Sequence, residues 1–258
     1  MEDLFASSRD LLDSADEHIE ETIGYFGFMQ ADKWASLIQE IDPKTGDRLC
    51  KVRFSGPVPI RVATRIFNVA TELRAALDHA VYSATVALSE RKDPGQAKFP
   101  FGDTAADCEQ DMMKGGAHIP PAIFKAIAAL KPYKAGNPTL WRLNKLRNVK
   151  DHRKLIVPAP AAYIADAKVD GSNTAVIHIA ERAGPEDDYI VARVSGGIPG
   201  TTTKLNVGLA LHVAFSEPAD LKGLDPLMFL INASRATREA VETIEQATIA
   251  ALNRQTDV

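Results

Sequence analysis

The sequence lacks most of the features that identify a secreted, membrane-spanning or disulfide-rich protein. Its 258 residues include only two cysteines, Cys50 and Cys108, which form no C-x-x-C pair and no ligand-like cluster. This usage fits a reduced cytoplasmic protein better than a disulfide scaffold. No run of about 18 apolar residues occurs, so no membrane span is expected. The first 21 residues are acidic and lack the basic-then-apolar layout of a signal peptide.

Familiar nucleotide, acyl-transfer and metalloprotease motifs are absent as well. The chain contains no G-x-G-x-x-G, G-x-x-x-x-G-K-[ST], G-x-S-x-G or H-E-x-x-H. The Gly-rich stretch GGIPGT at 196–201 leads into a strand pattern rather than a helix, which makes it a poor phosphate loop. We therefore expect no cofactor and no bound metal.

The net charge of −4 conceals an uneven distribution of charge along the chain. Residues 61–154 hold sixteen Lys and Arg against nine Asp and Glu, a net charge of +7, and the rest carries −11. The basic excess is densest at 131–154, whereas residues 1–30 hold eight acidic residues and one basic residue. A basic segment can attract a polyanion such as RNA. Alternatively, the acidic N-terminal helix packs near the basic segment and partly cancels its charge within the protein.

Apolar periodicity predicts an α+β fold, in which a helical bundle packs with an antiparallel β-sheet. A hydrophobic content of 45% is sufficient for a proper core. The turn DPKTGD predicts a β-hairpin after the N-terminal helix, and residues 99–116 are irregular or short-helical. Helical spacing or helix-ending prolines predict helices at about residues 2–22, 62–89, 120–131, 139–154 and 227–253.

After the fourth of these helices the hydrophobic period changes to two. Short turns separate the strand candidates, which suggests an antiparallel meander. The four candidates cover residues 161–169, 173–181, 188–195 and 205–215. We expect one integrated domain over 1–258: a helix and hairpin at 1–56, a helical core at 57–154, a β-meander at 155–217 and a C-terminal helix at 224–253.

Two heptapeptides with the same pattern stand out in the basic part of the chain. LRAALDH at 73–79 and LRNVKDH at 146–152 both read L-R-x-x-x-D-H, and both fall on predicted helices. In the first, the helical periodicity puts His79 nearly opposite the apolar face and places Arg74 one turn from Asp78, where the two can pair. In the second, Asn144, Arg147, Asn148, Asp151 and His152 form a continuous polar arc.

The Arg-to-His spacing resembles the ribonuclease motif of the HEPN superfamily, R-x4-6-H, in which a polar residue often follows the Arg. RNVKDH at 147–152 fits well, and RAALDH at 74–79 fits the spacing with Ala after the Arg. The chain also looks like a broad group of bacterial proteins with an L-R-x-x-L-D-H helix, an F-P step and a later D-H-R, matched here by FPF at 99–101 and KDHR at 150–153. The HEPN resemblance implies a helical, metal-independent RNase whose site joins two motifs across a homodimer or between two domains.

The residues also suit RNA cleavage chemically. Histidine titrates near neutrality and can act as acid or base, and a guanidinium can bind phosphate oxygens in a bidentate way. The candidate catalytic residues are Arg74, His79, Arg147, Asn148 and His152. Asp78, Asp151, Asn144 and Glu72 are candidate supporting residues, each Asp more plausibly orienting an Arg or a partner-helix group than its own His. Lys145, Lys150 and Arg153 are candidate substrate-binding residues.

The same residues allow a non-catalytic alternative. They could form a buried polar network that joins the two helices of a domain that binds a partner or a small ligand. A third possibility is a mixed metal site built from the two Asp-His pairs. The chain therefore could be an RNase or a binding domain, and we expect the Arg74 and Arg147 helices to pack together in either case.

The remaining histidines and aromatics have simpler explanations. His18 and His118 have no partner pattern and read as solvated surface residues, and His178 and His212 read as sheet-face residues. Isolated aromatics near helix starts are usually core residues, although they could stack on bases. Those of this chain are Trp34, Tyr133 and Trp141.

Overall fold

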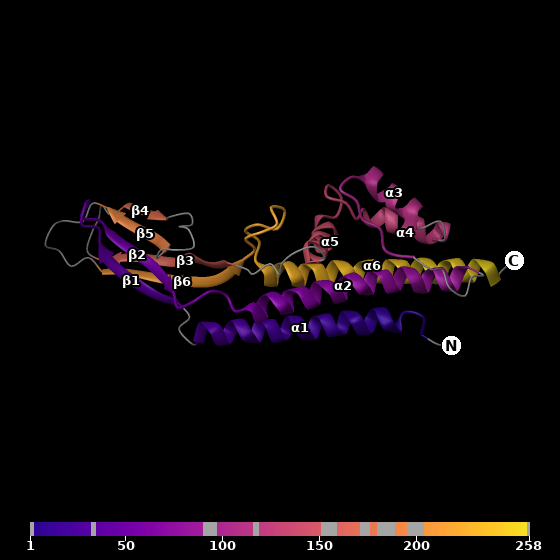
Figure 1. Cartoon of the computed structure of the whole chain (residues 1–258), viewed down its shortest axis with the longest axis horizontal. Coiled ribbons are helices and arrows are strands. Elements are labelled where there is room, and N and C mark those ends of the chain that lie inside the picture. The colour runs from indigo at the N-terminus through magenta and orange to yellow at the C-terminus, as the bar shows by residue number, and fades with distance from the viewer. Residues whose placement is uncertain are drawn as a thin grey trace.

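Three long helices run side by side along an elongated molecule, with the strands at one end (Figure 1). The computed structural model describes residues 3–31, 35–89, 97–115, 119–150, 159–170, 176–179, 189–195 and 204–256. The long helices are α1 (Ala6–Ala31), α2 (Ile60–Leu88) and α6 (Pro226–Thr256). The fold is α+β, with the predicted N-terminal helix, β-hairpin and long C-terminal helix.

Helix α1 lies antiparallel to α2 and α6 and contacts both of them. Its buried residues recur every three or four positions, so one continuous stripe faces the other two helices. The stripe consists of Phe5 just before the helix, then Ser8, Leu12, Ala15, Ile19 and Thr22. The exposed residues of α1 are mostly acidic. The outer face of this helix is therefore negatively charged, whereas its inner face carries no charge.

Three shorter helices form a layer on the far side of α2 and α6 from α1 (Figure 1). They are α3 (Ala105–Gly115), α4 (Pro121–Leu130) and α5 (Pro138–Lys150). Helix α4 has proline at its first position and ends at Lys131, which adopts a left-handed conformation with φ of 51°. Residues 99–116 are predicted as irregular or short-helical. In the described part, residues 99–104 contain no helix and α3 follows them.

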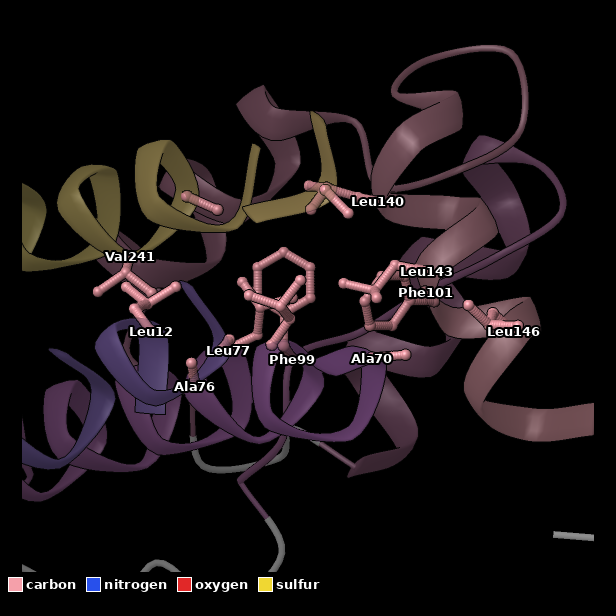
Figure 2. Packing of buried hydrophobic residues seen from close by; sticks show 14 of the residues in the cluster. Leu12, Ala70, Ala76, Leu77, Phe99, Phe101, Leu140, Leu143, Leu146 and Val241 are labelled. Atoms are coloured by element: carbon pink, nitrogen blue, oxygen red, sulfur yellow. The ribbon is translucent and has the colours of Figure 1, made fainter. Parts of the chain in front are cut away.

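Phe99 is 1% exposed and lies inside the hydrophobic core, among side chains of α1, α2, α5 and α6 (Figure 2). Leu77 of α2, Leu143 of α5 and Val241 of α6 surround this region, and Leu12 of α1 adds the fourth wall. The Phe-Pro-Phe segment therefore contributes buried aromatic side chains to the interior of the helical bundle.

The strands form two sheets, and the predicted meander is wrong. The hairpin strands β1 (Ala35–Ile41) and β2 (Arg48–Phe54) continue through β5 (Tyr189–Ser195) to β4 (Val176–Ile179) in a four-stranded antiparallel sheet. The other two strands, β3 (Ala159–Asp170) and β6 (Lys204–Ala214), pair only with each other among the described strands. Of the pairings between consecutive strands that a meander over β3 to β6 requires, the described residues show that of β4 with β5 alone.

Candidate functional site

The first heptapeptide forms a clasp between α2 and the Phe-Pro-Phe segment. Arg74 and Asp78 form an ion pair one helical turn apart. Asp78 Oδ1 accepts a hydrogen bond from the Phe99 backbone N–H at 2.8 Å, and Arg74 Nη2 donates to the Phe99 carbonyl oxygen at 2.9 Å. Both polar groups of one backbone residue are thereby satisfied inside the bundle, which permits Phe99 to be buried. We refer to Arg74, Asp78 and the Phe99 backbone as the clasp.

The guanidinium of Arg74 lies in a poorly solvated environment. Its side chain is 12% exposed, and its Cζ lies 4.6 Å from the centroid of the Phe101 ring. Burial lowers the pKa of Arg74, the nearby Asp78 carboxylate opposes that change, and the positive charge of Arg147 on α5 lowers the pKa further. Among the described residues its Nε has no hydrogen-bond partner. Both terminal nitrogens of Arg74 are therefore already bonded to protein oxygens.

His79 points away from the clasp. It is exposed, and its Nδ1 lies 2.7 Å from Oγ of Ser7 on α1. Arg74 faces the Phe-Pro-Phe segment, whereas His79 faces the seam between α1 and α2. As the helical periodicity predicts, the two side chains diverge, and within the chain they do not meet around one reacting atom.

The same seam holds a second histidine, for which the sequence-based interpretation was wrong. His18 was expected to be solvated without a partner, but its Nδ1 lies 2.9 Å from Oε2 of Glu72. Ser14 donates to the other oxygen of that carboxylate at 3.2 Å. Glu72, a candidate supporting residue, thus joins α1 to α2 and does not belong to the clasp.

The second heptapeptide is only partly within the described residues. Helix α5 contacts α2, as predicted, and places Arg147 close enough to Arg74 to influence its pKa. Arg147 and Asn144 are half-buried, whereas Asn148 is exposed. Lys150 is the last residue of α5. The candidates Asp151, His152 and Arg153 lie outside the described residues, as do His118 and Trp34.

Basic side chains gather around Trp141 where α5 meets the loop before it. The ammonium groups of Lys134 and Lys145 lie 4.8 and 5.3 Å from the centroid of the indole ring, which is a cation–π arrangement. Asp103 accepts hydrogen bonds from Trp141 Nε1 and pairs with Lys145, each at 2.8 Å. The bond from Lys145, followed by that from Trp141, lowers the pKa of Asp103. Trp141 itself is buried, as expected for a core aromatic, and its ring is not available for stacking on a base.

A second carboxylate comes from the loop before α6. Asp220 pairs with Lys134 at 2.8 Å, and its carbonyl oxygen accepts a hydrogen bond from Arg142 Nε at 3.0 Å. We call this surface the basic face. Its members are Lys131, Lys134, Arg142 and Lys145, with Asp103 and Asp220 as their acidic neighbours.

The acidic helix does not cover the basic face. Helix α1 lies on the opposite side of α2 from α5 (Figure 1), so the proposed neutralisation by α1 is wrong. Its carboxylates pair instead with arginines of the bundle: Asp13 and Asp16 with Arg238 of α6, and Glu21 with Arg65 of α2. Among the described residues, Asp103 and Asp220 pair with lysines of the basic face.

The other candidate ligands do not assemble into a site. Among the described residues no group of three or more His, Cys, Asp or Glu side chains could hold a metal ion. Cys50 and Cys108 are both buried, and burial raises the pKa of Cys108 to about 11. His178 lies opposite Arg193 in the β4–β5 pair, and His212 opposite Ala161 in the β3–β6 pair. No helix in the described part of the chain is both long and apolar enough to cross a membrane.

Sequence reasoning found Arg74, Asp78 and Lys145 and the Arg74–Asp78 pair, but it missed their partners in other parts of the chain. The Phe-Pro-Phe segment at 99–101 was noted only as part of a resemblance, and nothing near it in sequence indicates the bonds to α2. Ser7, Asp103 and Asp220 carry no local signal, because each contacts residues far along the chain.

No protein-family model, curated protein or solved structure matches this chain.

Proposed function

We propose that this protein is a non-catalytic binding protein whose basic face binds a polyanion such as single-stranded RNA. The observation that carries the proposal is the open basic face on α5 and the loop before it, which α1 leaves uncovered. Four basic side chains lie there, and two of them, Lys134 and Lys145, pair with aspartates. Lysines and arginines on an open surface bind phosphates through charge, with affinity that falls steeply as salt rises.

The arrangement of the first heptapeptide favours binding over catalysis. General acid–base catalysis with an anion clamp needs imidazole and guanidinium groups that converge on one reacting atom. Here Arg74 bonds Asp78 and the Phe99 backbone, and His79 lies beside Ser7. The HEPN-like RNase needs Arg and His side chains that converge, and those of the first heptapeptide have separate partners.

Binding of this kind should tolerate differences in RNA sequence. Base readout in single strands depends largely on exposed aromatic rings, and Trp141 at the centre of the basic face is 3% exposed. The cationic groups that remain attract phosphates through charge, and that attraction carries no sequence information. We therefore expect similar affinities for RNAs of different sequence and equal length.

The test is fluorescence anisotropy with labelled single-stranded RNA over a range of salt concentrations. We expect binding at low salt, with the log of the association constant falling linearly with the log of salt concentration. The double change Lys131→Glu and Lys134→Glu should reduce that slope by about two. Lys44→Glu, in the turn between β1 and β2, is the matched control and should leave binding unchanged.

The outcome also separates the two classes of function. Wild-type protein that binds no RNA at low salt would overturn the proposal. Cleavage of generic RNA that persists in EDTA and disappears in His152→Ala would replace it with the metal-independent RNase.

A further inference from the structure

Asp103 presents a carboxylate oxygen to solvent at the basic face. Its Oδ1 accepts hydrogen bonds from Trp141 Nε1 and from Lys145 Nζ, each at 2.8 Å. The side chain of Asp103 is nevertheless 61% exposed. Because both bonds go to the same oxygen, Oδ2 is left, in the described part of the chain, able to accept a hydrogen bond from a ligand.

The backbone on both sides of Asp103 is fixed. Gly102, just before it, donates its N–H to the Pro132 carbonyl oxygen at 3.3 Å. Thr104, just after it, caps α3: its Oγ1 accepts from the Asp107 N–H at 3.2 Å, and its own N–H donates to the Asp107 carboxylate at 3.0 Å. The indole that holds Oδ1 is itself buried. The carboxylate is therefore preorganised, so a ligand that bonds it loses little free energy to ordering the protein.

Asp220, the other aspartate of the basic face, is held less firmly. Its carboxylate pairs with Lys134, whose side chain is 59% exposed, rather than with a buried ring. A long, exposed lysine can move together with the group that it bonds. The side chain of Asp220 is also only 35% exposed. Asp103 is therefore the better placed of the two to bond a ligand.

The cations around Asp103 restrict the kind of ligand that fits. The ammonium groups of Lys134 and Lys145 lie 4.8 and 5.3 Å from the centroid of the same Trp141 ring. A ligand bound here needs negative groups for these lysines and, close to them, a hydrogen-bond donor for Asp103. Each nucleotide of RNA carries both a phosphate and a 2′-hydroxyl, whereas a nucleotide of DNA lacks the hydroxyl.

We propose that Asp103 makes the basic face selective for RNA over DNA, by accepting a hydrogen bond from a ribose 2′-hydroxyl while Lys134 and Lys145 bind neighbouring phosphates. This inference rests on the proposed function, since the nucleic acid must bind at the basic face. A carboxylate near phosphates weakens the binding of any polyanion, and the bond to the 2′-hydroxyl offsets that loss for RNA alone. Every ribonucleotide carries the same hydroxyl, so the selectivity is compatible with tolerance of base sequence.

The first test compares three labelled strands by fluorescence anisotropy at low salt: an oligouridylate and its 2′-deoxy and 2′-O-methyl counterparts of equal length. The deoxy strand lacks the hydroxyl, and the methylated strand keeps the oxygen but cannot donate. Wild type should bind the RNA about tenfold more tightly than either, as expected for one hydrogen bond to a charged group. Similar affinities for all three would overturn this inference and leave the proposed function standing, whereas binding of none would overturn both.

The second test removes the two carboxylates one at a time. Asp103→Ala should bring the ratio of RNA to DNA affinity to about one, and it should strengthen the binding of DNA because a like charge is lost. Asp220→Ala is the matched control: it removes a carboxylate from the same face, so it should strengthen the binding of both strands and keep their ratio. Circular dichroism checks that both variants are folded. A ratio that survives Asp103→Ala, or one that both variants abolish equally, would overturn the assignment of Asp103.

Discussion

The Arg, Asp and His of the first heptapeptide have different roles in α2, because successive positions on a helix point in different directions. Asp78 and His79 are neighbours in sequence, yet Asp78 bonds the buried Phe99 backbone and His79 bonds Ser7 on another helix. Arg74, one turn before Asp78, shares its side of the helix. The L-R-x-x-x-D-H pattern in this helix is thus a structural clasp plus one seam contact.

We predict that the Arg and the Asp of this heptapeptide matter for stability and that the His does not. Asp78→Asn and Arg74→Lys should each lower the free energy of unfolding by about 1–3 kcal/mol, because buried partners lose hydrogen bonds. His79→Ala should change it by less than about 0.5 kcal/mol, since the side chain is exposed. Urea unfolding followed by circular dichroism measures all three. Equal destabilisation by His79→Ala would show that the clasp is assigned wrongly.

At the scale of elements, close backbone contacts join α3 to the Phe-Pro-Phe segment and to the α4–α5 connection. Gly102 donates its N–H to the Pro132 carbonyl oxygen at 3.3 Å. A Cβ at Gly102 would lie 2.3 Å from the backbone N of Cys108 and 2.7 Å from the carbonyl oxygen of Thr104. The first turn of α3 therefore packs directly on this glycine, and only a residue without a side chain fits.

Gly102→Ala should therefore destabilise the protein. Backbone atoms would have to shift to admit the methyl group, which costs on the order of 1–3 kcal/mol for an overpacked site. Gly56→Ala is the matched control, because a Cβ there meets no atom within 4 Å. Thermal melts of the two variants beside wild type give the comparison. A melting temperature of Gly102→Ala that matches the control would contradict the close approach.

At the scale of the whole molecule, charge is separated across the bundle. Acidic α1 lies on one side of α2, and the basic face lies on the other, near the shorter helices (Figure 1). The long helices also extend the molecule well beyond the dimensions of a compact domain. The net charge of −4 describes neither side, so it is a poor guide to the partners of this protein.

The elongated shape predicts a large radius of gyration. A compact chain of this length would have a value of about 18 Å. Small-angle X-ray scattering of the protein, extrapolated to zero concentration, should give a clearly larger value with an asymmetric distance distribution. A symmetric distribution and a value near the compact limit would mean that the strands fold back onto the helices in solution.

Most elements could be predicted from the sequence because their signals are local. Apolar spacing located α2 and α6 to within a few residues of their observed ends, and DPKTGD marked the β1–β2 turn, where Gly46 has a φ of 73°. The end of α1 was placed nine residues too early, since observed α1 continues to Ala31 beyond the clear stripe. Strand order could not be predicted, because β2 pairs with β5 across more than a hundred residues of chain.

The sequence by itself determined the α+β composition, the long amphipathic helices and the Arg74–Asp78 pair, because each depends on residues within one or two helical turns. Only the tertiary structure decided what those residues contact. It buried the Phe-Pro-Phe segment against the clasp, turned His79 toward α1, and left the basic face open on the side away from α1. The physical reason is that hydrogen bonds and charge pairs act over a few ångströms in space, and the partners here come from distant parts of the chain.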